Sequence, residues 1–268
     1  MSHSGISATG RGELATVMAG GRRFVRPEHV SSLLQVNADE AAKKLSRWAA
    51  QGWLRRVRRG LYIGVPVEAA HPASWSEDPL VVAAEVWPCY FTGWTAANEW
   101  ALSDQVFRTT VLKTTSRVRA SNVRLLDHDY LISSTTDADM RWGMKSQWRH
   151  ESRLRFADPA RTVVDILDAP RLGGGMRHGA EILAAYLDEH DPTTLLDYGD
   201  RLGNRALFKR LGYSIEAMGR DLPRMLSACQ ERVSAGISAL DPDGPPGGRS
   251  NTRWGLRINV TVGAEEPA

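Results

Sequence analysis

In the amino-terminal quarter of the chain, apolar residues recur at helical spacing and then give way to a strand-like segment. A helix is predicted over residues 11–19, because its apolar positions lie three and four residues apart. A second helix opens at Pro27, whose ring suits a first helical position. A third begins after the capping residue Asn37. Residues 53–65 then predict a β-hairpin with its turn near Gly60.

The third predicted helix separates apolar and polar residues onto different faces. The face expected to be buried carries apolar side chains: Ala41, Leu45, Trp48 and Ala49. Another stripe carries the candidate DNA-contact residues Lys43, Lys44, Arg47 and Gln51. Arg and Lys can hydrogen-bond to guanine, and Gln to adenine, so such a stripe suits a helix in the major groove. The alternative is an ordinary solvated helix face.

The hairpin that follows favours the DNA-binding interpretation. Its four arginines cannot all be buried, so most should project into solvent: Arg55, Arg56, Arg58 and Arg59. An arginine-rich hairpin can follow the phosphate backbone or reach into the minor groove. Arg22 and Arg23 would add backbone contacts. Two helices followed by a hairpin are typical of a winged helix-turn-helix that binds double-stranded DNA, and we assign it to residues 1–66.

The rest of the chain predicts a larger mixed α/β domain, so the expected fold class is α+β. Residues 1–10 are expected to be disordered, and residues 67–74, with little pattern, are expected to form a linker. The second domain, residues 75–268, begins with predicted helices over 78–86 and 95–102. Predicted strands follow at 109–113, 123–126, 129–133 and 152–156. From Asp158 the pattern is helical, with two or three further helices over 177–230 and a final strand over 252–262.

Charge is unevenly distributed along the chain. Residues 1–70 carry eleven Lys and Arg against five Asp and Glu, whereas the remainder carries 23 against 26. A basic module on a mildly acidic body indicates a polyanion partner at one end, although an ordinary charged surface would also explain it. No apolar run approaches the roughly 18 residues of a membrane span, and no signal-peptide core is seen. We therefore expect a cytoplasmic protein without membrane association.

Signals for catalysis or for a cofactor are poor. Gly173-Gly174-Gly175 lacks the lysine and hydroxyl of a phosphate-binding loop and is better explained as a helix stop and turn. Asp127-His128-Asp129 lies between two predicted strands, where Asp and His are ordinary turn residues. Cys89 has an apolar setting, and neither cysteine belongs to a CxxC motif. We expect no enzymatic activity, no catalytic residue, no metal and no cofactor.

Four further segments stand out: GWLRRVRRGLYIGVP (residues 52–66), FTGWTAANEWAL (91–102), FADPARTVVDILDAPRLGGG (156–175) and RWGLRINV (253–260). Together they resemble the AbiEi-type antitoxin and transcriptional-regulator family of type IV toxin–antitoxin systems. The resemblance spans residues 14–260 and rests on the order and spacing of the four segments.

The resemblance implies a repressor that binds inverted repeats in its own promoter, and hence autoregulation with two copies on the DNA. It also implies a carboxy-terminal antitoxin domain that opposes a nucleotidyltransferase toxin encoded next door, without a stable complex being required. Arg161, in the DPxRT segment, is a candidate for antitoxicity. The alternative for Arg161 is a structural arginine paired with Asp158 or Asp165.

Two other functions remain open at this point. The body could bind a small ligand, which would make the protein a one-component winged-helix regulator with no toxin involved. The winged helix could also target a nuclease or another DNA-modifying enzyme, in which case Asp127 or Asp129 would be needed for metal-dependent cleavage.

Overall fold

The computed structural model describes residues 6–66, 68–69 and 75–263. The chain divides into two compact units. The first comprises Met1–Val86 and Arg124–Asp129, and the second comprises Trp87–Val123 and Tyr130–Ala268. Residues 75–86, which we placed in the second domain, thus belong to the first unit. Residues 67 and 70–74 of the expected linker lie outside the described residues.

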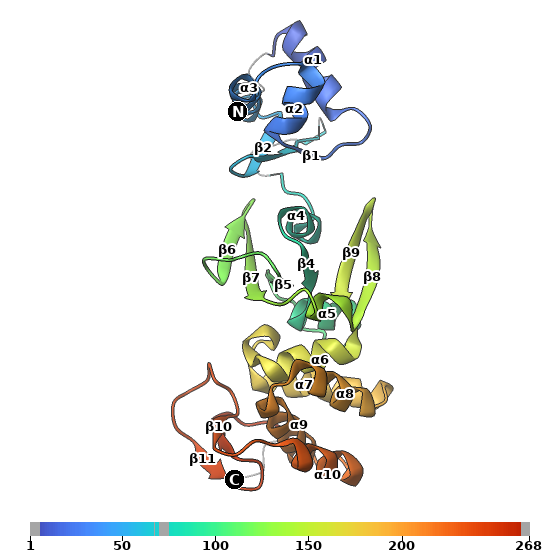
Figure 1. Cartoon of the computed structure of the whole chain (residues 1–268), viewed down its shortest axis with the longest axis vertical. Coiled ribbons are helices and arrows are strands. Elements are labelled where there is room, and N and C mark those ends of the chain that lie inside the picture. Colours follow the sequence, from blue (N-terminus) through green and yellow to red (C-terminus); the bar gives the residue numbers. More distant parts are fainter. Residues whose placement is uncertain (1–5, 67, 70–74, 264–268) are drawn as a thin grey trace. The chain divides into compact units, whose positions relative to one another are not determined.

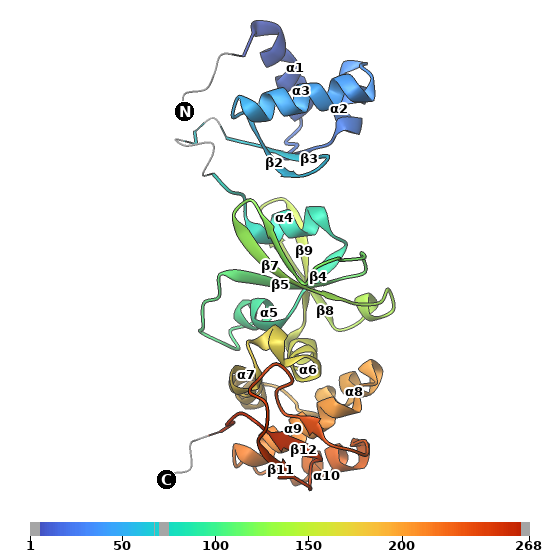
Figure 2. The same cartoon turned by 90° about the vertical axis from the view of Figure 1, so that its left-hand side faces the viewer.

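In the first unit, the helices within residues 8–50 lie above a small antiparallel sheet (Figure 1, Figure 2). Its elements are α1 (Ala8–Met18), β1 (Phe24–Val25), α2 (Pro27–Leu34), α3 (Ala38–Ala50), β2 (Leu54–Arg58), β3 (Leu61–Gly64) and α4 (Pro79–Val86). The sheet order is β1-β3-β2, so the short strand between α1 and α2 closes the hairpin on one side.

Helix α1 begins earlier than the apolar pattern indicated. Ser7 Oγ accepts a hydrogen bond from Gly10 N at 3.1 Å and caps the helix. Residues 8–10 are therefore helical, which corrects our expectation of disorder over 1–10, while residues 1–5 lie outside the described residues. The side-chain cap at Ser7 stabilises the start of the helix, although the composition of residues 8–10 gave no helical pattern.

Helices α1, α2 and α3 share one hydrophobic core with the hairpin. The predicted inner face of α3 is buried at Ala41, Leu45 and Trp48, and it packs against Leu54 and Tyr62 of the hairpin. Burial of apolar area is the dominant favourable term in such a small unit. This packing determines which face of α3 remains in solvent.

The second unit is built on a mixed six-stranded sheet of order β6-β7-β5-β4-β9-β8. The strands are β4 (Cys89–Phe91), β5 (Thr109–Thr114), β6 (Asn122–Leu125), β7 (His128–Ser134), β8 (Met144–Arg149) and β9 (Ser152–Ala157). Strands β4 and β9 pair in parallel, with Phe91 opposite Phe156. The four predicted strands are present, and β4 and β8 are additional.

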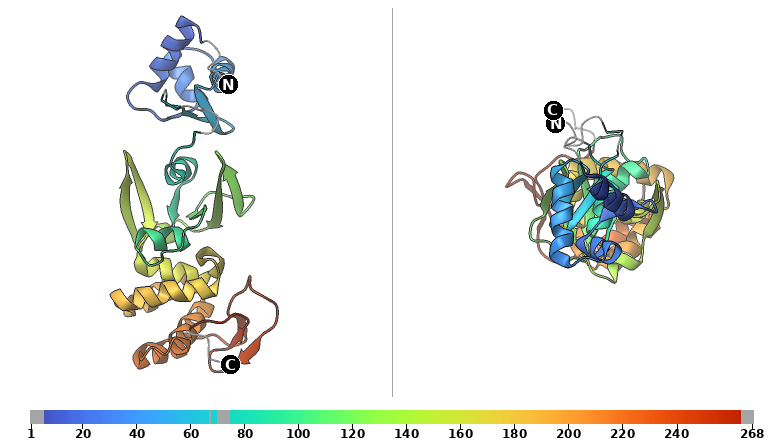
Figure 3. Two further views of the ribbon diagram at one scale, coloured as in Figure 1. Left: turned by 180° about the vertical axis from the view of Figure 1, so that it is seen from behind. Right: turned by 90° about the horizontal axis from the view of Figure 1, so that it is seen from above.

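Helices α6–α10 gather beside this sheet (Figure 3). The helices of this unit are α5 (Gly93–Glu99), α6 (Pro159–Asp168), α7 (Met176–Glu189), α8 (Thr193–Leu202), α9 (Arg205–Ala217) and α10 (Pro223–Arg232), with 3-10 turns η1 (Asp139–Arg141) and η2 (Pro170–Gly173). A small sheet of β10 (Ser238–Ala239), β11 (Arg249–Asn251) and β12 (Leu256–Ile258) completes the unit. Its core includes the fully buried Trp254. The mixture of helices and sheets confirms the α+β class.

No helix within the described residues is both long and apolar enough to cross a membrane.

Candidate nucleic-acid interface

Helix α3 presents two of the predicted DNA contacts to solvent. Asn37 Oδ1 accepts a hydrogen bond from Glu40 N at 2.9 Å, so the predicted N-cap is present. Because the apolar face of α3 is buried, the face opposite is turned outward. Lys43 and Arg47 lie one turn apart on it and are exposed. Neither has an acidic partner among the described residues.

The hairpin adds three exposed arginines. The β2–β3 register shifts between Arg56 and Arg58, which makes Val57 the extra residue of a β-bulge. Val57 is buried, whereas Arg56, Arg58 and Arg59 are exposed. Gly60 follows at the turn with a φ of +77°, a left-handed conformation that glycine adopts without a steric penalty. Most of the hairpin arginines thus project into solvent, as expected.

Two other predicted contacts are held by acidic side chains of the same unit. Lys44 Nζ lies 2.8 Å from Glu13 Oε2 of α1, and only 16% of the Lys44 side chain is exposed. Arg55 Nη2 lies 2.9 Å from Asp127 Oδ2, and Arg55 also donates to the carbonyl oxygen of Trp75. These two cations are neutralised within the protein, unlike the arginines farther along the hairpin.

The remaining predicted contacts are also partly engaged. Arg22 Nη1 donates to Val17 O at 3.1 Å, and Arg23 Nη2 pairs with Glu77 Oε2 at 2.9 Å. Gln51 is half-buried, and its Oε1 is buried without a hydrogen-bond partner. The structure therefore separates the ten predicted contacts into five exposed cations and five engaged or half-buried residues. We call Lys43, Arg47, Arg56, Arg58 and Arg59 the exposed cation set.

The second unit contains a buried ionic cluster around Asp165 on α6. Asp165 Oδ1 accepts from Lys113 Nζ at 2.8 Å and from Arg161 Nε at 3.0 Å. Its Oδ2 accepts from Thr92 Oγ1 at 2.7 Å and from Tyr90 OH at 3.0 Å. Asp165 and Arg161 are fully buried. Charges this deep persist only when they are paired and hydrogen-bonded.

The environment of this cluster keeps both partners ionised. Burial acts to raise the pKa of Asp165, but the charges of Lys113 and Arg161 outweigh it and hold the pKa below its usual value. The guanidinium of Arg161 also lies 3.6 Å from the centre of the Trp142 ring, a cation–π contact. Its side chain pairs with Asp165 and not with Asp158, whose Oδ1 instead caps α6 at Arg161 N. Arg161, our candidate for antitoxicity, is therefore inaccessible to a partner in this conformation.

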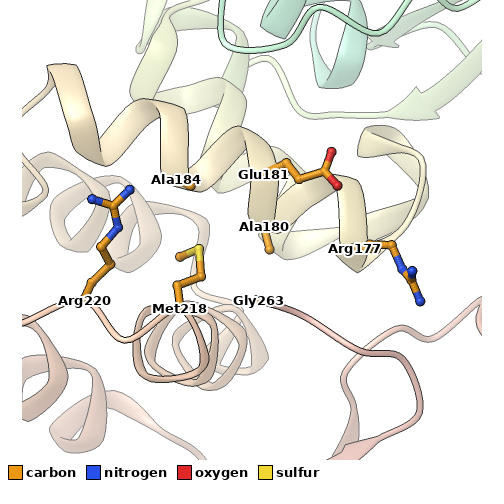
Figure 4. A pocket seen from close by; sticks show the side chains of 7 residues that line it. All are labelled: Arg177, Ala180, Glu181, Ala184, Met218, Arg220 and Gly263. Atoms are coloured by element: carbon orange, nitrogen blue, oxygen red, sulfur yellow. The ribbon is translucent and has the colours of Figure 1, made fainter. Parts of the chain in front are cut away.

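A groove of about 310 Å³ lies between α7 and the end of α9 (Figure 4). Ala180 and Ala184 face Met218 across it, with Arg177 and Arg220 at opposite ends (Figure 4). Glu181 and Gly263 complete its lining. Arg220 is paired with Asp188 at 2.7 Å. The volume is at the lower limit of small-molecule sites.

The residues considered for chemistry have structural partners. Burial raises the pKa of the Cys89 thiol to about 12, so the thiolate needed for attack is not available near neutral pH. Gly175 leads into α7, and the amide of Met176 at the start of that helix donates to Asp241 Oδ2 at 2.8 Å. This carboxylate occupies the position that a phosphate would take. Within the described residues, no three His, Cys, Asp or Glu side chains are grouped so as to hold a metal ion.

The groove and Lys113 had no recognisable signal in the sequence. Lys113 ends a predicted strand and gave no signal of burial, because its partner Asp165 is 52 residues away. The groove joins α7 to residues 218–220 and Gly263, which no spacing rule connects.

These features define an α+β protein with a small basic unit of helices and a hairpin and a larger mixed unit. Neither a family model nor a curated protein sequence matches this chain. Its fold is similar to the crystal structure of the RV2827C protein from Mycobacterium tuberculosis, with a TM-score of 0.64 and 14% sequence identity. The match covers 95% of this chain and 93% of that one. At this identity the likeness shows a shared fold alone.

Proposed function

We propose that this protein is a cytoplasmic DNA-binding repressor and the antitoxin of a two-gene toxin–antitoxin operon. The observation that carries the DNA-binding part is the exposed cation set. Its five members lie on α3 and the hairpin of one small unit, and no acidic side chain of the described residues neutralises them. Unpaired cations grouped in this way suit a polyanion.

The arrangement of elements supports a winged helix-turn-helix. The order α1-β1-α2-α3-β2-β3, with β1 closing the hairpin sheet, fits that module. In this assignment α3 is the recognition helix, and Lys43 and Arg47 read base edges in the major groove. Arg56, Arg58 and Arg59 then contact phosphates or the minor groove from the wing. Lys44 and Arg55 position α3 and the hairpin instead of contacting DNA.

The operator would consist of inverted repeats. A single α3 reads one half-site, so a repeated and inverted sequence requires two copies of the chain on the DNA. We propose that the operator lies in the protein's own promoter, as the resemblance to AbiEi-type regulators implies.

The antitoxin part rests on that resemblance. Its motif FADPARTVVDILDAPRLGGG covers α6 and the buried cluster of Arg161 and Asp165, which supports a structural role for the motif. Antitoxicity would then come from the surface of the second unit, against a nucleotidyltransferase toxin encoded by the adjacent gene.

Growth rescue tests this proposal directly. The adjacent gene is induced alone and together with the full-length protein. We expect arrest in the first culture and growth in the second. A harmless adjacent gene, or arrest that co-expression leaves unchanged, would reject the antitoxin function.

The groove between α7 and α9 favours a second candidate, a regulator that senses a small ligand. Arg177 at one end of an apolar floor suits a ligand with an acidic group, whereas Arg220 at the other end is already paired with Asp188. Operator affinity that changes with a metabolite, and no longer does so in Arg177→Ala, would support this candidate. Operator affinity that does not change with any metabolite would contradict the ligand-sensing function.

A further inference from the structure

The hairpin of β8 and β9 places a tryptophan in solvent at the edge of the main sheet. Strand β8 is the last strand of the sheet order, and the two strands pair in antiparallel register over their whole length (Figure 1). Trp148 lies opposite Arg153, which is also exposed. The Trp148 residue is 64% exposed, whereas Trp254 in the same unit is fully buried.

The segment that contains this hairpin is a basic island on an acidic unit. Residues 140–157 hold five Lys and Arg and one Glu: Arg141, Lys145, Arg149, Arg153, Arg155 and Glu151. The remainder of residues 71–268 carries 25 Asp and Glu against 18 Lys and Arg. Arg149 pairs with Glu99, but Arg141, Lys145 and Arg153 have no acidic partner among the described residues. The island therefore presents unneutralised positive charge.

Protection of a sheet edge explains only part of this pattern. Charged side chains on an edge strand prevent pairing with another chain, which accounts for Lys145 and its neighbours. An exposed indole does not prevent association with another molecule but favours it, because it leaves a large apolar surface in water. An aromatic ring beside a cation, as Trp148 lies beside Arg153, suits a partner with both flat rings and negative charges.

We propose that the Trp148–Arg153 face of this hairpin binds single-stranded nucleic acid. The indole of Trp148 stacks on an unpaired base, and Arg153 opposite it contacts the phosphates. A duplex keeps its bases stacked on one another and offers no free ring, so unpaired nucleotides suit this face better. The surface lies on the second unit and is separate from the exposed cation set of the first unit, so it does not depend on the proposed operator binding.

Fluorescence anisotropy with the full-length protein tests the proposal. The probes are fluorescein-labelled single-stranded 12-mers of mixed sequence, one of DNA and one of RNA. We expect Trp148→Ala to weaken binding about 5- to 150-fold, the equivalent of one lost stacking contact. Trp148→Phe, which keeps a ring, should retain most of the affinity, and Arg153→Gln should weaken binding and reduce its salt dependence. The two probes show whether the face prefers RNA or DNA.

Ile237→Ala is the matched control, because Ile237 is 60% exposed and lies outside the hairpin. It should leave the affinity unchanged. Equal affinity of wild type and Trp148→Ala for both 12-mers overturns the proposal, as does single-strand binding that disappears only in Arg58→Ala/Arg59→Ala. If a polyglutamate peptide competes as well as the 12-mers and its binding also requires Trp148, the face recognises an acidic protein instead. None of these outcomes bears on duplex binding, which is tested with α3 variants.

Discussion

At the scale of single residues, a basic side chain is a DNA-contact candidate only if the protein leaves its charge unpaired. Lys43 and Lys44 are neighbours on α3, yet Lys44 is held by Glu13 while Lys43 is exposed. Arg55 is similarly held by Asp127, whereas Arg58 projects from the same strand. Substitutions of paired and unpaired cations should therefore have different effects on DNA affinity.

The double variant Arg58→Ala/Arg59→Ala tests the wing. We expect weaker binding to all duplexes alike, because phosphate contacts carry no sequence information. Each lost phosphate contact should also reduce the slope of log K against log salt by about one. Affinity measured at several salt concentrations checks this. A matched Lys44→Ala variant should leave the slope nearly unchanged, and an unaltered slope in the double variant would exclude the wing as a phosphate contact.

We expect removal of the Asp165 charge at the centre of the buried cluster to lower the free energy of unfolding strongly. Asp165→Asn leaves the buried Arg161 without its paired carboxylate and Lys113 with only the more distant Asp168 at 3.9 Å, which should destabilise the protein by about 3–5 kcal/mol. Urea unfolding of the two proteins measures this difference. The surface variant Asp188→Asn, which loses the pair with Arg220, should cost less than about 1 kcal/mol. Similar costs for the two variants would contradict the assigned role of Asp165.

The carboxylate of Asp165 should also make the stability of the protein depend on pH in the acidic range. The pKa of Asp165 is lowered in the folded protein, so its contribution is complete above its unfolded-state pKa of about 3.9. That contribution is lost as the pH falls through the lower folded-state pKa. The stability difference between wild type and Asp165→Asn should therefore shrink below about pH 4. Unfolding curves between neutral pH and pH 3 measure it, and a constant difference would mean that Asp165 is not ionised in the fold.

At the scale of elements, helix α3, the proposed recognition helix, depends on its cap. Asn37→Ala removes the acceptor for Glu40 N and should destabilise the protein by about 1 kcal/mol. Asn37→Asp keeps an oxygen acceptor and should be nearly neutral. Thermal unfolding of both variants measures the effect, and equal midpoints for Asn37→Ala and wild type would show that the cap contributes nothing.

Elements with local signals could be predicted from the sequence. Pro27 and Asn37 mark helix starts, and Asp158 before Pro159 marks the start of α6, because these signals act within one turn. Strands β4 and β8 lack such signals. Strand β4 has three residues after Pro88, and β8 is polar along most of its length, so its existence depends on pairing with β9.

The sequence could predict which face of α3 is exposed, but not which cations of the candidate site are paired with acidic side chains. Helical periodicity indicated which face of α3 is exposed, and this face does carry Lys43 and Arg47. The pairing of Arg55 with Asp127 bridges 72 positions of sequence, and that of Lys44 with Glu13 bridges 31. Such contacts arise from tertiary packing, which no local pattern encodes.

At the scale of the whole molecule, we propose that the first unit represses transcription and that the second unit provides antitoxicity. Full-length Arg58→Ala/Arg59→Ala should therefore lose repression of a reporter driven by its own promoter while still restoring growth against the adjacent gene. Reporter output and growth are measured in the same strain. Loss of both activities in a folded variant would mean that antitoxicity requires DNA binding.

Binding of the full-length protein to the duplex upstream of its own gene, against a shuffled duplex of equal composition, tests whether α3 is the recognition helix. We predict that wild type prefers the upstream duplex, that Lys43→Ala/Arg47→Ala binds both duplexes equally, and that Lys44→Ala keeps the preference. A wild-type protein without preference, or a preference that survives in Lys43→Ala/Arg47→Ala, would contradict the assignment of α3 as the recognition helix.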